Sequence, residues 1–173
     1  DLSPGSADTS AGLVFLAGSD GTGGYAALLE RELDEQVLLD GGHFERSPMY
    51  HAILLEDLLD LLQLDQAYPG VMPPSLTKGL RARVRKALRW LRVMSHPDGD
   101  IAFFNDAALG IAPPVATLEV YACQLGIDGF ADHLQALEVL PESGYVRMAV
   151  GDAVLIADVG PVGPDYLPGH AHA

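Results

Sequence analysis

The spacing of apolar side chains and the residues that flank each segment predict four helices in the first three quarters of the chain. Apolar residues recur every three or four positions over 25–39, 48–64 and 75–95, with charged residues between them. Ser75 is placed to cap the third of these segments. A fourth helix is predicted from the proline pair at 113–114 to residue 125, followed by a glycine. Turns rich in proline and glycine separate these segments, so we expect stacked helical hairpins.

The hydrophobic period changes after Gly126. Residues 144–150 alternate between apolar and polar or small side chains, and residues 153–157 are apolar. Between them Gly151-Asp152 suits a two-residue hairpin turn. Helices followed by strands predict an α+β protein with two segregated parts, which we assign to residues 1–126 and 127–173.

Composition and charge limit the classes of partner. The chain has 173 residues, of which 49% are hydrophobic, enough for a substantial core. Its formal net charge of −14 argues against nucleic acid and anionic membrane surfaces as partners. We also expect no membrane span, because no apolar run is long enough. The single cysteine, Cys123, excludes an internal disulfide.

Basic residues are concentrated in the third predicted helix. Seven of the ten lysines and arginines lie between Lys78 and Arg92, at helical spacing. Two interpretations remain open: a surface that binds an anionic glycan, or an outer helix face that pairs with the acidic helices, which we favour. The acidic residues of the second helix are interpreted as a solvated face rather than a metal site. The loop at 18–24 is glycine-rich but lacks the Lys-Ser/Thr of a phosphate-binding loop.

The most informative stretch is Asp40–His51, which leads into the second predicted helix. Its two glycines suit a tight reversal, and Ser47 and Pro48 suit the N-cap and first helical position. Tyr50 then falls in the first helical turn. There the helix dipole and nearby Arg46 favour negative charge, so the phenol can serve as an acid or base. The alternative is that this stretch only starts a helix and that Tyr50 is a half-buried aromatic residue.

The histidines near the end of the chain form a second candidate group. In an extended segment His170 and His172 point to the same side, so both imidazoles can line one site. A two-histidine metal site with further ligands is one interpretation of this spacing. His96 and His133 have no partner in the sequence and are expected at the surface or in turns.

Two runs of sequence resemble the heparinase II/III-like family of polysaccharide lyases, of the alginate lyase and heparinase type. The first is Asp-Gly-Gly-His-Phe-Glu-Arg-Ser-Pro-Met-Tyr-His at 40–51. The second, at 157–173, is similar to the start of the family's β-domain signature and includes Gly-His-Ala-His. The resemblance implies an incomplete α/α toroid, then the first strands of an antiparallel β-sandwich, with the active site in the cleft between them. The chain lacks an initiator methionine and stops inside the second run, so we expect a piece of a longer protein.

The resemblance also implies an activity, namely β-elimination on an anionic polysaccharide that contains uronic acid. Tyr50 and His170 match catalytic positions of this carbon–oxygen lyase chemistry. His43, Glu45 and Arg46 are assigned to substrate binding. Because the average field of an acidic protein repels such a substrate, a local basic site would be needed.

A metal and a cellular location follow only from the same resemblance. His172 matches a ligand to a divalent metal such as zinc, whose other ligands would lie beyond Ala173. A periplasmic or secreted location agrees with the family, although the sequence shows no signal segment.

The sequence departs from the family pattern at one position. Family members supply an asparagine or histidine several dozen residues before the tyrosine, to neutralise the substrate carboxylate. The single asparagine here is Asn105. We therefore expect the piece by itself to be inactive, and we keep a second hypothesis, a non-catalytic module that binds glycan or serves a structural role in exopolysaccharide handling.

Overall fold

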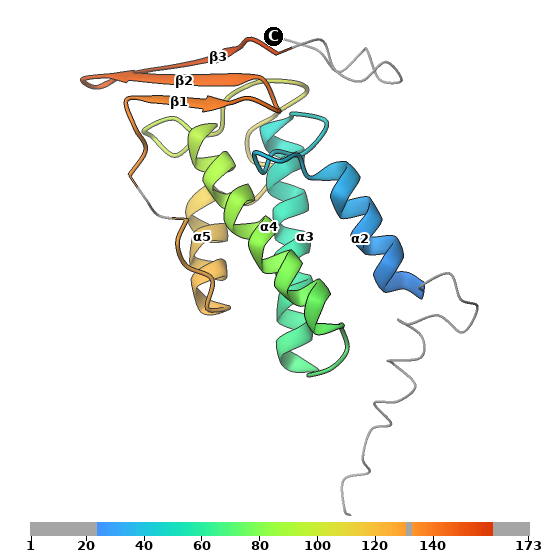
Figure 1. The fold of residues 1–173 in the computed structure, drawn as a ribbon. Helices are drawn as coiled ribbons and strands as arrows, with labels where there is room; N and C mark the ends of the chain where they lie inside the picture. The colour runs from blue at the N-terminus through green and yellow to red at the C-terminus, as the bar shows by residue number, and fades with distance from the viewer. Residues whose placement is uncertain (1–23, 131–132, 161–173) are drawn as a thin grey trace, which may run out of the picture.

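The computed structural model describes residues 24–130 and 133–160, which form four helices followed by one antiparallel sheet (Figure 1). The sheet lies across one end of the helices, near the start of α3 and the end of α4. The predicted α+β class is confirmed. The elements are α2 (Gly24–Gln36), α3 (Pro48–Ala67), α4 (Pro74–Val93), α5 (Val115–Gln124), β1 (Leu137–Leu140), β2 (Tyr145–Val150) and β3 (Ala153–Asp158).

A serine cap marks the start of one helix, and a pair of prolines marks the start of the next. Helix α3 begins at the predicted residue, Pro48, with Ser47 as its N-cap. The predicted cap of the next helix was wrong, because α4 begins at Pro74 and Pro73 occupies its N-cap position without a side-chain hydrogen bond. Proline is tolerated there because a first-turn amide has no partner within the helix, so its absence costs little.

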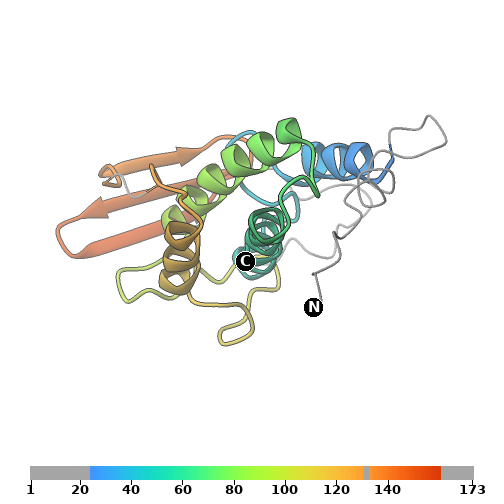
Figure 2. The same ribbon diagram turned by 90° about the horizontal axis from the view of Figure 1, so that it is seen from below.

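The helices share one apolar core. Helix α3 packs against α4, and α5 contacts both; Figure 2 shows the three seen from below. The largest fully buried side chains of this core are leucines and an isoleucine, namely Leu55, Leu59, Leu62, Leu76, Leu80, Leu88, Leu91, Leu118 and Ile127. Each such side chain stabilises the fold by about 1.5–3 kcal/mol relative to an exposed one. None of the described helices is both long and apolar enough to cross a membrane.

The sheet has the order β1-β2-β3, with both neighbouring pairs antiparallel. The hairpin turn predicted at Gly151-Asp152 is confirmed between β2 and β3. Strand β1 was not predicted, because four residues are too few for a clear alternation. The face toward the helices buries Leu140, Tyr145 and Ile156 against Trp90 of α4. The opposite face exposes apolar side chains, namely Leu137, Val139, Met148, Val150 and Leu155.

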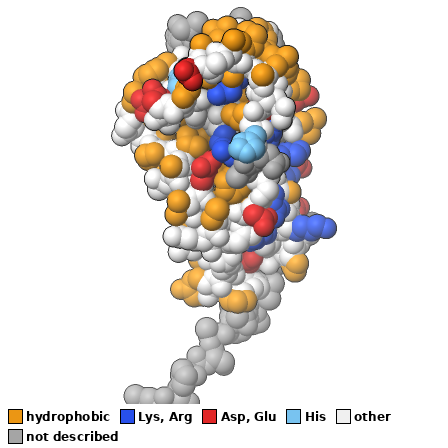
Figure 3. Space-filling view, turned by 90° about the vertical axis from the view of Figure 1, so that its left-hand side faces the viewer, with side chains coloured by type: hydrophobic (Ala, Val, Ile, Leu, Met, Phe, Trp, Pro, Cys, Tyr) orange, Lys and Arg blue, Asp and Glu red, His pale blue; other side chains and the backbone are white. Residues whose placement is uncertain are grey.

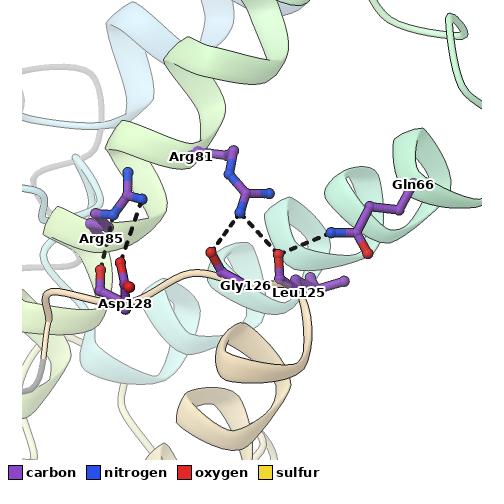
Figure 4. A network of polar contacts seen from close by, with 6 residues as sticks. All are labelled: Gln66, Arg81, Arg85, Leu125, Gly126 and Asp128. Carbon is purple, nitrogen blue, oxygen red and sulfur yellow. Dashed lines mark hydrogen bonds and ion pairs between the residues drawn. The ribbon is translucent and has the colours of Figure 1, made fainter.

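The basic face of α4 makes contacts within the molecule (Figure 4). The Arg81 guanidinium donates to the carbonyls of Leu125 and Gly126, at 2.9 and 2.7 Å, beyond the end of α5. Arg85 donates to the backbone carbonyl of Asp128 and lies 3.9 Å from its carboxylate. Further ion pairs are Arg83–Asp34, Arg89–Glu138 and Arg92–Glu119. The pairing interpretation is therefore supported, with partners on α2, α5, β1 and a loop instead of on α3.

Candidate active site

Tyr50 lies in the first turn of α3, where the sequence predicted it. Its backbone N–H donates to the Oγ of the fully buried N-cap Ser47 at 3.4 Å. The side chain itself is half-buried. The first-turn amides of a helix have no intrahelical acceptor and carry the positive end of its dipole. The Tyr50 side chain is therefore held at the positive end of α3, next to the turn that precedes the helix.

Arg46, just before the cap, adopts a left-handed backbone conformation with φ of 61°. Such a conformation is uncommon outside glycine and asparagine and needs support from its surroundings. Two side chains supply it: the Arg46 carbonyl accepts from the Tyr145 hydroxyl at 2.9 Å and from Asn105 Nδ2 at 3.4 Å. Asn105 also donates to the Tyr145 hydroxyl at 3.1 Å and is itself left-handed, with φ of 50°. The turn before Tyr50 is thus fixed from β2 and from the loop after α4.

Two buried histidines hold the same stretch against α4. The His51 Nδ1 accepts from the backbone N–H of His43 at 3.1 Å, so Nε2 carries the proton and donates to the Ala87 carbonyl at 2.9 Å. Burial lowers the pKa of His51 to about 3 and that of His43 to about 4. Both imidazoles are therefore neutral near pH 7, and His43 can meet a substrate as a hydrogen-bonding group but not as a cation.

Asp40 ties the start of this stretch to the sheet. One carboxylate oxygen accepts from the Ser143 N–H at 2.7 Å, the Ser143 hydroxyl at 2.8 Å and the Glu142 N–H at 3.1 Å. The Ser143 hydroxyl in turn accepts from Trp90 Nε1 at 2.8 Å. A Cβ at Gly42 would lie 2.5 Å from that same Trp90 nitrogen, so only glycine fits. The Asp-Gly-Gly run is therefore both a reversal and a joint between α4 and the β1–β2 turn.

The predicted site residues fall into two groups. Tyr50, His43, Glu45 and Arg46 lie within one short segment that leads into α3, and Glu45 and Arg46 are half-buried. The predicted residues His170 and His172 lie outside the described residues. Within the described ranges, no group of three or more His, Cys, Asp or Glu side chains could hold a metal ion.

Sequence reasoning did not assign Asn105 and Tyr145 to this region. Asn105 and Asp106 both have positive φ, a conformation that asparagine and aspartate tolerate best. Alternation along β2 puts Tyr145 on the face opposite Val146. That signal does not show that its hydroxyl meets the Arg46 carbonyl, 99 residues away in the chain.

Fold and site together define an α+β protein in which helical hairpins meet an antiparallel sheet beside a helix start that carries a tyrosine. A family model described as "Heparinase II/III N-terminus" matches residues 22–117, and one described as "Heparinase II/III-like, C-terminal" matches residues 132–173. The chain belongs to the heparinase II/III family, which confirms the resemblance drawn from its two sequence runs.

Two similar proteins add detail. The crystal structure of heparan sulfate lyase HepC from Pedobacter heparinus matches with a TM-score of 0.61 and 20% identity, over 94% of this chain and 28% of that one. At this identity the match shows the shared fold. FtsZ-localized protein C from Caulobacter vibrioides is 35% identical over 137 residues, which is 77% of this chain. The chain spans only 21% of the length of that relative.

Proposed function

We propose that this chain is part of a polysaccharide lyase that cleaves an anionic, uronic-acid-containing polysaccharide by β-elimination. The observation that carries the proposal is Tyr50, half-buried in the first turn of α3 beside Arg46. Membership of the heparinase II/III family supports the reaction class. The match to a heparan sulfate lyase makes a glycosaminoglycan the first substrate to test.

The reaction requires a proton carrier and neutralisation of charge. A base takes the proton from the carbon next to the carboxylate, a carbon–carbon double bond forms, the glycosidic carbon–oxygen bond breaks, and the leaving oxygen takes a proton. The carbanion is accessible only if the substrate carboxylate is neutralised as charge develops. In the proposal Tyr50 moves the proton, and His170 assists at the carboxylate or in the proton transfer.

Residues next to Tyr50 are assigned to the substrate. Arg46 supplies a positive charge, and its left-handed backbone is fixed by Tyr145 and Asn105. His43 supplies a neutral hydrogen-bonding group, since its pKa of about 4 keeps it uncharged. Glu45 completes the proposed set. Asn105 is not assigned as the carboxylate neutraliser, because its amide nitrogen already donates to Arg46 and Tyr145.

A divalent metal such as zinc enters the proposal only through His172 as a ligand. The described residues contain no cluster that fits such an ion, so no step of the reaction is derived through it.

The test is turnover of a panel of uronate polymers, including heparan sulfate and alginate, by the full-length protein. Product formation is followed by the ultraviolet absorbance of the new carbon–carbon double bond. We expect Tyr50→Phe to lower kcat by about a hundredfold or more, the scale of losing a positioned proton carrier. Its unfolding free energy should fall by no more than about 1 kcal/mol, because the ring is kept.

Tyr68→Phe is the matched control, since Tyr68 is 65% exposed at the other end of α3. It should leave both turnover and stability unchanged. Normal turnover by Tyr50→Phe would remove Tyr50 from the mechanism.

A second candidate function is a non-catalytic module that uses the lyase fold to bind glycan or to assemble with other proteins. The 35% identity to a protein named for its localisation by FtsZ favours this alternative. Co-sedimentation of the full-length protein with FtsZ polymers tests it. Co-sedimentation that Tyr50→Phe leaves intact, in a protein inactive on every polymer of the panel, would favour the non-catalytic role over the lyase.

A further inference from the structure

A pocket of about 270 Å³ lies where the end of α4, the start of α5 and β2 meet. Its wall includes Arg92, His96, Val115, Ala116, Glu119 and Arg147. No residue of the stretch 40–51 lines it. In Figure 3 apolar side chains gather at the sheet end of the face shown, and lysine and arginine side chains lie among the side chains below them.

Arg147 is the unusual member of this wall. Its side chain is on the face of β2 that packs toward the helices, and the residue is only 9% exposed. Within the described part of the chain its Nε is buried without a hydrogen-bond partner, and the guanidinium forms no ion pair. The carboxylate paired across the strands and the carboxylate that lines the pocket are both engaged elsewhere. Glu138, opposite Arg147 on β1, binds Arg89 at 2.8 Å, and Glu119 binds Arg92 at 3.1 Å.

An arginine side chain does not avoid the cost of burying its charge by losing its proton. A buried lysine or histidine becomes neutral when desolvation is costly, but a guanidinium stays charged at any pH at which the protein is folded. A buried charge is tolerated when an opposite charge and hydrogen-bond acceptors reach it. The pocket next to Arg147 is the space in which such a group fits.

The start of α5 supplies a second, independent feature of the same pocket. Pro114 occupies the N-cap position and provides no side-chain hydrogen bond, whereas the next two residues, Val115 and Ala116, line the pocket. The amides of a helix's first two residues have no intrahelical acceptor. Together with the helix dipole they form a site that favours an anion.

We propose that this pocket binds a small oxyanion, such as a sulfate, phosphate or carboxylate group, between the Arg147 guanidinium and the amides of Val115 and Ala116. The planar guanidinium matches two oxygens of such a group, and the amides match another. Among the lining side chains two guanidiniums face one carboxylate, so a single extra negative charge balances the pocket. The inference does not depend on the chemistry proposed for Tyr50.

The experiment is calorimetric titration of the purified protein with inorganic sulfate, against chloride at equal ionic strength. We expect sulfate to bind, and Arg147→Met to weaken binding at least tenfold. The matched control is Arg31→Met, which removes the same charge from a 70% exposed side chain on α2 and should leave the affinity unchanged. Absence of sulfate and phosphate binding by the unmodified protein would overturn the proposal.

Arg147→Lys is a second variant, which keeps the test decisive if Arg147→Met does not fold. It keeps the charge and most of the stem but loses the planar fork, so weaker binding by a folded lysine variant supports the site. Unchanged affinity in every Arg147 variant that folds would overturn the proposal.

Two further arms identify the source of the oxyanion. The same titration is run with inorganic phosphate and with a sulfated, uronate-containing oligosaccharide. Tighter binding of the oligosaccharide than of both free ions assigns the pocket to a glycan, and equal or weaker binding assigns it to a free ion.

Discussion

The helical core and the joint between helices and sheet are held together by different means. The core between α2, α3, α4 and α5 consists of apolar side chains. The joint combines a smaller apolar cluster around Trp90 and Tyr145 with partly buried hydrogen bonds that the Asp40 carboxylate and the Arg46 carbonyl accept. Apolar packing tolerates many arrangements of similar volume, whereas hydrogen bonds have preferred directions. We infer that the core supplies most of the stability and that the joint fixes how the Tyr50 stretch faces the sheet.

The largest loss of stability is expected from a substitution in the apolar core of the helices. Leu80 is fully buried in α4, so Leu80→Ala should lower the unfolding free energy by about 2–5 kcal/mol through lost transfer energy and a residual cavity. Urea unfolding followed by far-ultraviolet circular dichroism measures it. Leu39→Ala, at a position 76% exposed, is the control and should change stability little. Equal losses for both variants would contradict the assignment of Leu80 to the core.

The second expected effect comes from removing hydrogen bonds at the joint between helices and sheet. Asp40→Ala removes the acceptor of three hydrogen bonds from Glu142 and Ser143, which should cost about 2–3 kcal/mol. Trp90 is the only tryptophan and donates to Ser143, so its fluorescence reports the joint directly. We expect the emission of the folded variant to shift while the helical circular dichroism stays close to normal.

Asp57→Ala, at an exposed position of α3, is the matched control for this variant. Unchanged Trp90 emission in Asp40→Ala would show that Asp40 does not hold the joint.

The third effect is the dependence of stability on pH. Burial lowers the folded-state pKa of His43 to about 4 and of His51 to about 3, from an ordinary value of 6.5. Between these values and 6.5 the unfolded chain binds more protons than the folded one, so stability is full above pH 6.5 and is lost as the pH falls. Each histidine contributes a slope of about 1.4 kcal/mol per pH unit between roughly pH 4 and 6.

His51→Gln isolates one of these contributions. The glutamine side chain offers an acceptor and a donor but does not titrate, so the slope should decrease by that amount relative to the unmodified protein. Urea midpoints at several pH values measure it, and an unchanged slope would show that His51 does not titrate as inferred.

The smallest expected effect concerns the surface of α4. Arg81→Met removes two hydrogen bonds to the Leu125 and Gly126 carbonyls, in a partly exposed position. We expect a loss of about 0.5–1 kcal/mol, since solvent competes for both partners. Thermal unfolding compared with Arg31→Met measures the difference. A loss of unfolding free energy as large as that of Leu80→Ala would contradict this, because it would show that solvent does not compete for these hydrogen bonds.

Much of the local structure was predictable because its causes are local. Helical periodicity identified α2, α3 and α4, and the prolines and glycine that flank α5 identified that helix. Ser47-Pro48 fixed the start of α3, and Gly151-Asp152 fixed the hairpin turn. These signals act between residues a few positions apart. Strand β1 was missed because it is four residues long and its pairing with β2, not its own sequence, makes it a strand.

The sequence by itself determined the α+β class, the family and the place of Tyr50 in a first helical turn. Only the tertiary structure decided what surrounds that turn. Asp40 meets Ser143 across 103 residues, and the Arg46 carbonyl meets the Tyr145 hydroxyl across 99. Such contacts depend on how helices and sheet pack, which no local pattern encodes. The same packing buries Arg147 beside the start of α5. Neither the sequence around Arg147 nor the sequence at the start of α5 indicates a site by itself.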